Sequence, residues 1–209
     1  MDPLVIWIIV LTIIIFFQIC FDISYFLRTV WVTFIAMCFK KTIDISDETT
    51  ITGFCFTTDL DQFLHGMNNS KYLREVDFAR LDFSIRLGSM RAIAENKGAG
   101  AVKKATIVYC RFIKLSTIFK IKTKLLYWDN KSFYLQYKFI TKGGLINAFV
   151  IQEVKMINCT CESILESISQ RIKQTVKKPE PPEFLVKWIE GNSNLQDDKS
   201  ASITTITTM

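Results

Sequence analysis

Residues 68–88 read NNSKYLREVDFARLDFSIRLG and contain the clearest helical pattern of the chain. Its apolar residues recur at spacings of three and four, which places them on one face of an α-helix: Tyr72, Val76, Ala79, Phe83 and Leu87. Three more widen the apolar surface to over half of the circumference: Phe78, Leu81 and Ile85. Asn68 or Asn69 can cap the start, and Gly88 ends or kinks the helix. A helix with this much apolar surface must be enclosed by other elements.

Strand patterns lie on both sides of this helix. Residues 48–58, before it, are rich in β-branched and aromatic types, which favour strands. Four strands are predicted after it: 105–115, 119–125, 133–139 and 145–156. Turn residues at 128–131 and 142–144 indicate hairpins, and consecutive hairpin-linked strands form an antiparallel sheet. The order of elements therefore predicts an α+β hotdog fold, an antiparallel sheet wrapped around a long central helix.

The chain continues past the last strand into a polar end. Residues 161–176 have the spacing of a short amphipathic helix, which prolines at 179, 181 and 182 stop. Residues 184–189 are expected to dock as one more turn. We therefore predict a hotdog domain over 45–178 and a proline-containing extension over 179–209, whose Ser/Thr-rich end is disordered.

Composition excludes several classes of protein. Of the 209 residues 49% are hydrophobic, and the mean hydropathy of +0.23 is high for a soluble domain. The 22% of charged residues are too many for a multi-span transporter, and 17 Phe with 4 Pro exclude low-complexity disorder. The net charge is +6, but no Lys/Arg-rich tract or zinc-finger spacing occurs, so no nucleic-acid partner is expected.

The apolar excess is concentrated at the N-terminus. Pro3 to Phe21 is an uncharged run of 19 residues, which as a helix spans about 28 Å, close to the thickness of a bilayer core. A cleaved signal peptide would need a basic start and a small-residue cleavage site, and neither is present. A helix in a protein core would show a polar stripe, which Leu4–Ile15 lacks. The pattern favours a retained membrane anchor within 1–41, with membrane lipid as a partner.

Flanking charges predict the orientation of this anchor. Arg28, Lys40 and Lys41 follow the span, so the positive-inside rule places the rest of the chain in the cytosol. Residues 22–39 fit either an interfacial amphipathic helix or a second, partial insertion. Three N-glycosylation sequons point the other way: Asn68-Asn69-Ser70, Asn130-Lys131-Ser132 and Asn158-Cys159-Thr160.

The cysteines and the single histidine give no metal-site spacing. None of the six cysteines forms a C-x-x-C pair, so zinc is not expected, and free thiols suit a cytosolic domain. No cofactor is predicted.

Residues 59–80, DLDQFLHGMNNSKYLREVDFAR, carry a resemblance to a known family. The D-x-D…H…N-N-x-x-Y run resembles the thioesterase superfamily member 6 family, and is similar to the motif of plant acyl-carrier thioesterases, which are hotdog enzymes. Tyr127-Trp128-Asp129 and Pro181-Pro182-Glu183 support the likeness, which covers most of residues 1–190. Two features depart from the pattern: an extra residue between His65 and Asn68, and Phe63 where the plant enzymes have Asn.

The resemblance implies hydrolysis of fatty acyl thioesters. Asp59 or Asp61 would activate water or attack directly, and His65 would polarise the carbonyl. Asn68 and Asn69 lie where free helix amides favour an oxyanion. Tyr72 completes the motif as a substrate-binding residue, although its spacing is typical of a core position. The acyl chain would lie between helix and sheet. On residue types alone, the acids also fit turn formers, Asn68 a cap and His65 a structural histidine.

Two functional hypotheses follow. In the first, the chain is a membrane-anchored hotdog thioesterase of the endoplasmic reticulum, with its domain in the cytosol and acyl-CoA as substrate. In the second, it is a non-catalytic acyl-binding or scaffold protein at the same membrane. Hotdog domains usually pair through their sheets, so the resemblance also implies a homodimer.

Overall fold

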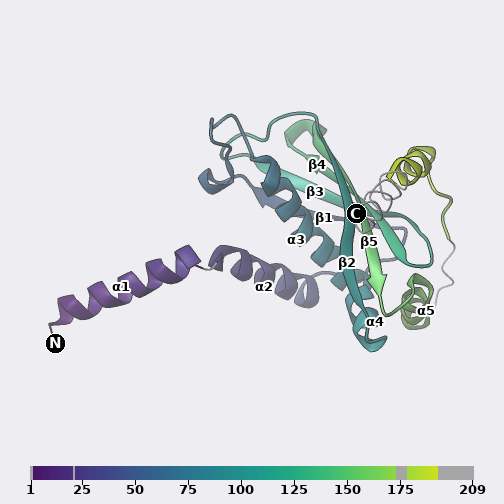
Figure 1. Cartoon of the computed structure of the whole chain (residues 1–209), viewed down its shortest axis with the longest axis horizontal. Coiled ribbons are helices and arrows are strands. Elements are labelled where there is room, and N and C mark those ends of the chain that lie inside the picture. Colours follow the sequence, from purple (N-terminus) through teal and green to yellow (C-terminus); the bar gives the residue numbers. More distant parts are fainter. Residues whose placement is uncertain (1, 21, 173–177, 193–209) are drawn as a thin grey trace, which may run out of the picture.

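A five-stranded sheet packs against a long helix, α3, in the computed structural model, which describes residues 2–20, 22–172 and 178–192 (Figure 1). The helices are α1 (Pro3–Cys20), α2 (Ile23–Cys38), α3 (Asn69–Leu87), α4 (Ser89–Glu95), α5 (Cys161–Ile172) and an unlabelled helix over 183–192. The strands are β1 (Glu48–Phe54), β2 (Ala99–Tyr109), β3 (Ile118–Trp128), β4 (Ser132–Ile140) and β5 (Ile146–Ile157). Short 3₁₀ turns cover Thr57–Asp59 and Lys142–Gly144.

The predicted hotdog fold is confirmed, with one correction to the order of its strands. All neighbouring strands are antiparallel, and the order is β1-β3-β4-β5-β2. The hairpins at 128–131 and 142–144 occur as predicted. The expectation that every strand is hairpin-linked to the next is wrong for β2, which pairs with β5 at the far edge. Its link to β3 therefore crosses the sheet.

The bounds of two strands, β1 and β2, also differ from the prediction. β1 ends at Phe54 rather than at 58, because the Asp59 carboxylate accepts a hydrogen bond from the Phe56 N–H at 2.9 Å and closes a 3₁₀ turn there. β2 begins at Ala99 and ends at Tyr109, six residues before each predicted boundary. The chain leaves the sheet after β2 because Ile113 is fully buried and its carbonyl accepts from Met67 at 2.8 Å.

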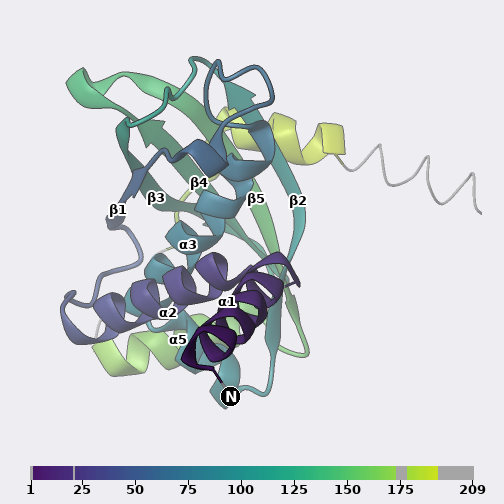
Figure 2. The same ribbon diagram turned by 90° about the vertical axis from the view of Figure 1, so that its left-hand side faces the viewer.

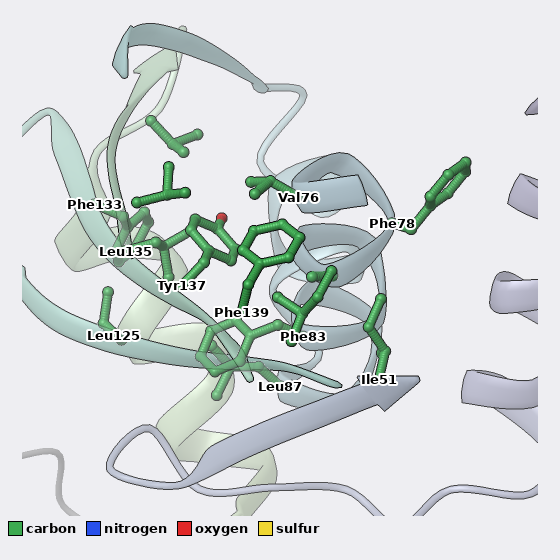
Figure 3. Packing of buried hydrophobic residues seen from close by; sticks show 14 of the residues in the cluster. Ile51, Val76, Phe78, Phe83, Leu87, Leu125, Phe133, Leu135, Tyr137 and Phe139 are labelled. Atoms are coloured by element: carbon green, nitrogen blue, oxygen red, sulfur yellow. The ribbon is translucent and has the colours of Figure 1, made fainter. Parts of the chain in front are cut away.

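α3 has two buried faces, which explains its unusual apolar surface. Toward the sheet it presents Val76, Phe83 and Leu87, which pack with strand residues such as Tyr137 and Phe139 (Figure 3). Its ends follow the prediction: Asn68 caps the start, and Gly88 is left-handed at φ 77°. The opposite face carries three more buried residues: Glu75, Phe78 and Asp82. Phe78 points away from the sheet (Figure 3).

α2 covers this second face of α3. Its Tyr25 ring lies 5.2 Å from that of Phe78, and the two helices run past each other in front of the sheet (Figure 2). Arg28 of α2 forms a two-pronged ion pair with Glu75, and Lys40, just after α2, lies 2.6 Å from the Asp82 carboxylate. α2 is thus held by buried charges as well as by apolar contact.

The outermost elements of the chain are α1 and the helix over 183–192. α1 extends away from the domain and exposes its large apolar side chains (Figure 1). Among the described residues no single helix has the length and hydropathy to cross a membrane, whereas Pro3–Gln18 and Ile23–Cys38 meet both conditions as a bent pair. Phe21, the end of the predicted span, lies outside the described residues.

At the other end of the chain, the amphipathic helix predicted over 161–176 is α5, which is described to Ile172. Residues 173–176 lie outside the described residues. The tail is predicted to be disordered from Gly191, but Gly191 and Asn192 are the last residues of the helix over 183–192, and residues 193–209 lie outside the described residues. The turn expected over 184–189 is part of the helix over 183–192, whose Leu185 is buried against Tyr134 and Ile151 on the other face of the sheet.

Gly53 in β1 is a sensitive point of the packing between sheet and helix. A Cβ there would overlap the ring of Phe119 and lie 3.1 Å from Oε2 of Glu75, both buried. We expect Gly53→Ala to lower the free energy of unfolding by about 1–3 kcal/mol, because an overpacked core must shift. Chemical unfolding of the full chain in detergent measures this. Gly191→Ala, where no atom lies within 4 Å, is the control, and an equal loss in both would contradict the prediction.

Candidate functional site

The predicted site residues lie on the loop between β1 and α3, which is built around two carboxylates. Asp59 accepts from the Phe56 N–H through Oδ2, and its Oδ1 lies 3.8 Å from Nζ of Lys71. Its carbonyl accepts from the Asn68 N–H at 2.7 Å. Asp59 therefore joins the end of β1 to the first turn of α3, with one carboxylate oxygen facing a lysine.

Asp61 organises the tip of the loop. Its Oδ1 accepts from the backbone N–H groups of Phe63 at 3.2 Å and His65 at 2.9 Å. These bonds stabilise a tight turn in which Leu64 has a left-handed φ of 58°. The other oxygen, Oδ2, lies 3.9 Å from Nδ1 of His65. Asp61 thus serves as a turn former and keeps one oxygen available for chemistry.

His65 lies on the surface of this loop. Its side chain is 67% exposed, and its ring stands 5.9 Å from that of Phe63 and 6.3 Å from that of Phe112. The structure therefore brings His65 to Asp61, on an open apolar surface.

The two asparagines divide their tasks at the helix start. Asn68 is the cap, and its Oδ1 accepts from both the N–H and the hydroxyl of Ser70 at 3.0 and 2.8 Å. The exposed Asn69 offers its carbonyl to the Tyr109 hydroxyl at 3.1 Å. Asp59 and Asn68 lie at the positive end of the α3 dipole, which favours negative charge there.

Tyr72 is a core residue. It is 2% exposed, and its ring meets those of Tyr109 and Phe139 at about 5 Å in edge-on geometry. Burial raises the pKa of Tyr72 to about 12, so its phenol stays neutral at physiological pH. The expectation of a core position is confirmed.

Two buried groups, Cys55 and Glu75, lie beside the loop, and the sequence did not place either of them at the site. Burial, then the charges of Asp59 and Glu75, raises the pKa of the Cys55 thiol to about 11. Burial also raises the pKa of Glu75, and Arg28 partly offsets that rise. Asp59 therefore has an inert thiol and a second, ion-paired carboxylate in its electrostatic surroundings.

Glu75 has a partner that spacing along α3 does not indicate. Local spacing fits a pair with Lys71, Arg74 or Arg80, whereas the partner is Arg28, 47 residues away on α2. Arg74 pairs with Asp22, and Arg80 pairs with Asp77. The spacing of residues along a helix predicts pairs within that helix. It does not predict a contact with a residue of another helix.

A cavity of about 360 Å³ lies along the second half of α3, within the range of small-molecule sites. Its walls are mainly apolar and come from α2, α3, α4 and the sheet, with Leu81, Phe133 and Met156 as examples. Asp77 and Arg80, paired at 2.7 Å, add polar groups. None of the predicted site residues lines it, because they lie in the loop before α3 or in its first turn, whereas the cavity begins at Asp77.

The rest of the described chain shows no metal site. No group of three or more His, Cys, Asp or Glu side chains is arranged to hold an ion within residues 2–20, 22–172 and 178–192. The described cysteines are free thiols, as predicted: Cys38, Cys55, Cys110, Cys159 and Cys161.

A sheet around one helix, with an acidic loop at the start of that helix, defines the class of hotdog thioesterase-like proteins. Residues 55–189 match the sequence profile of the thioesterase-like superfamily. The chain is 33% identical over 198 residues to Protein THEM6 of Drosophila melanogaster, covering 92% of this chain and 99% of that protein. It is 37% identical over 171 residues to Protein THEM6 of Danio rerio, covering 81% and 82%. The chain therefore belongs to the thioesterase-like superfamily and, within it, to the THEM6 family.

Solved structures agree on the fold. The probable thioesterase YbaW of Escherichia coli superposes with a TM-score of 0.51 at 23% identity, covering 62% of this chain and 98% of that one. BH1999, a gentisyl-coenzyme A thioesterase, gives 0.51 at 19% identity, covering 57% and 98%. SAV2348 of Staphylococcus aureus, solved in complex with CoA, gives 0.51 at 17% identity, covering 69% and 96%.

The ion pair between Arg28 and Glu75 gives a test of how α2 supports the site. The Glu75 side chain is 5% exposed, so Arg28→Ala leaves a buried, uncompensated carboxylate. We expect a loss of about 2–4 kcal/mol in unfolding free energy. Adding Glu75→Gln to this variant should recover most of it. Arg91→Ala, which breaks a more exposed pair with Glu95, is the control and should cost under about 1 kcal/mol.

The same variant has a predictable pH dependence. Burial raises the folded-state pKa of Glu75, and removal of Arg28 takes away the charge that lowers it. A carboxyl with a raised folded-state pKa favours folding below its unfolded pKa, and this contribution is lost as the pH rises through the folded pKa. The deficit of Arg28→Ala should therefore shrink on acidification. A deficit that is constant between neutral and acidic pH would contradict this assignment.

Proposed function

We propose that the chain hydrolyses fatty acyl thioesters, with acyl-CoA as the substrate class. The observation that carries this proposal is the Asp59–Asn68 loop at the start of the central helix of a hotdog domain. Two proteins of similar fold act on or bind CoA compounds, as their descriptions state, which supports the choice of CoA as the carrier.

Asp61 is the proposed base. Its Oδ1 accepts from two backbone N–H groups, and its Oδ2 lies 3.9 Å from Nδ1 of His65. Oδ2 takes a proton from water as the water oxygen bonds to the thioester carbon. The C–S bond then breaks, and the departing thiolate takes up the proton that Asp61 received, which restores the carboxylate. Asp59 is the second candidate, because its Oδ1 faces solvent-accessible Lys71 at 3.8 Å.

In this proposal the developing oxyanion lies at the start of α3, and the acyl chain lies in the cavity along its second half. Positive potential at the start of α3 stabilises negative charge on the carbonyl oxygen, and His65 assists from the open side. The apolar cavity begins about 12 Å further along the helix. A thioester at the loop reaches this cavity only through a long acyl chain, so long-chain substrates are expected to be preferred.

A release assay for free CoA thiol tests the proposal on a panel of acyl-CoA thioesters of increasing chain length. Asp61→Asn should lower kcat by about 10²–10⁴, the usual contribution of a general base, and His65→Ala should lower it less. Gln62→Ala, an exposed change on the same loop, is the matched control and should keep full activity. Unchanged turnover in both Asp59→Asn and Asp61→Asn would remove these assignments.

A non-catalytic acyl-binding role is the second candidate, favoured by specific features of the loop. Both acids already accept loop N–H bonds, and His65 is largely exposed. Phe63, 68% exposed, stands where the plant enzymes have an amide. Saturable binding of acyl-CoA by the wild-type chain, with no thiol released, would select this role over hydrolysis.

The membrane assignment is part of the same proposal. α1 exposes apolar residues, and Lys40 and Lys41 follow the α1–α2 pair, which supports an endoplasmic reticulum anchor with the domain in the cytosol. Asn130 lies in a sequon on an exposed turn. A glycosidase-sensitive mass shift in cells would therefore contradict the cytosolic orientation.

We also propose a homodimer formed through the edge strand β2. β2 has one neighbour, β5, and is exposed along most of its length. An unpaired edge of this length is normally covered or paired in a stable protein. Sedimentation of the full chain in detergent as a monomer would contradict this pairing.

A further inference from the structure

α2 has a second apolar face, turned away from the domain. Its large side chains are 49–69% exposed: Phe26, Leu27, Val30, Trp31, Phe34 and Met37. They recur at spacings of one, three and four, and so form one continuous stripe on the helix. We call these six residues the outer stripe. A stripe of this size on a folded protein marks an interaction surface.

The charges of α2 are arranged to leave the outer stripe uncharged. Arg28 is the only charged residue between Ile23 and Cys38, and it turns inward. Its guanidinium pairs with Glu75 and lies 4.4 Å from the centre of the Phe78 ring. No charge would therefore have to be dehydrated when the outer stripe enters an apolar medium.

The exposed surface of α1 favours a bilayer over a protein as the apolar surroundings of the outer stripe. It continues directly into the α2 segment and exposes large apolar residues around its whole circumference. A protein partner covers one side of a helix, whereas lipid chains surround it. Trp31 and Phe34 on the outer stripe also belong to the residue types that gather at membrane interfaces.

The same helix forms part of the wall of the apolar cavity. Tyr25 and Thr29 line it, next in sequence to Phe26 and Val30 of the outer stripe. Met90 of α4, 47% exposed, stands on the cavity wall as well. The cavity and the outer stripe therefore lie on adjacent faces of α2.

We propose that α2 lies in the plane of a lipid bilayer with its outer stripe among the acyl chains, and that the cavity takes a hydrocarbon chain directly from that bilayer. That the occupant is an acyl chain rests on the proposed function. The position of α2 in the bilayer does not. The domain stays docked throughout, because the Arg28–Glu75 pair holds α2 parallel to the membrane surface.

Trp31 reports the position of the outer stripe. The full chain with Trp7→Phe is reconstituted in phosphatidylcholine vesicles whose lipids carry bromine near the ester end or near the methyl end of the acyl chains. We expect bromine near the ester end to quench a component of the fluorescence, and Trp31→Phe to remove that component. Trp188→Phe is the matched control, because Trp188 sits on the opposite face of the sheet, and the quenched component should persist.

Three results would overturn the in-plane position. Trp31 fluorescence insensitive to both brominated lipids would place the outer stripe against a second copy or another protein. Quenching mainly by bromine near the methyl end would indicate a spanning α2 separated from the domain. Failure of the chain to float with vesicles would exclude the bilayer. None of these readouts requires turnover. They therefore test the position of α2 even if the chain does not hydrolyse thioesters.

Chain uptake is tested with vesicles that contain a photoactivatable fatty acyl lipid. We expect label on the peptide that covers residues 77–93, and competition by unlabelled long-chain fatty acid. Thr29→Phe, which fills the cavity beside α2, should abolish this label. Ser24→Phe, on the exposed side of α2, should retain it. Thermal unfolding confirms that both variants fold, and equal label in both, or none in the wild type, would overturn uptake from the bilayer.

Discussion

Two buried carboxylates on the central helix determine how the parts of this molecule are held together. Glu75 and Asp82 lie on the face of α3 that the sheet does not cover, and both are at most 5% exposed at their side chains. A buried carboxylate without a partner costs several kcal/mol. Arg28 of α2 is the partner of Glu75, and Asp82 pairs with Lys40, just after α2, and at 3.6 Å with Arg86 of α3, so the α2 segment supplies a cation to each carboxylate.

This constraint fixes the apolar N-terminal segment relative to the site. α2 is tied to the middle of α3, the acidic loop lies at the start of α3, and the cavity follows its second half. Any displacement of α2 would expose Phe78 and break both ion pairs at once. The outer stripe of α2 and the wall of the cavity are thus two sides of one pair of helices.

Features set by short-range patterns were predictable from the sequence, and features set by distant contacts were not. The caps of α3, its core face and both hairpins depend on residues within a few positions of one another, and the structure has them. The place of β2 beside β5 and the partner of Glu75 depend on residues about 50 positions apart. Periodicity contains no information on such pairings, although the excess apolar surface of α3 did indicate that a second cover was needed.

The site loop limits prediction from sequence in a different way, because the same side chain can have both a structural and a chemical role there. Asp59 and Asp61 close turns and Asn68 caps a helix, which are the roles that residue type alone predicts. Yet in each acid the other carboxylate oxygen faces a basic side chain, Lys71 for Asp59 and His65 for Asp61, and an oxygen so placed is suited to handle a proton. The structural role does not compete with the chemical one. It holds the second oxygen in position, which a base on a mobile loop would lack.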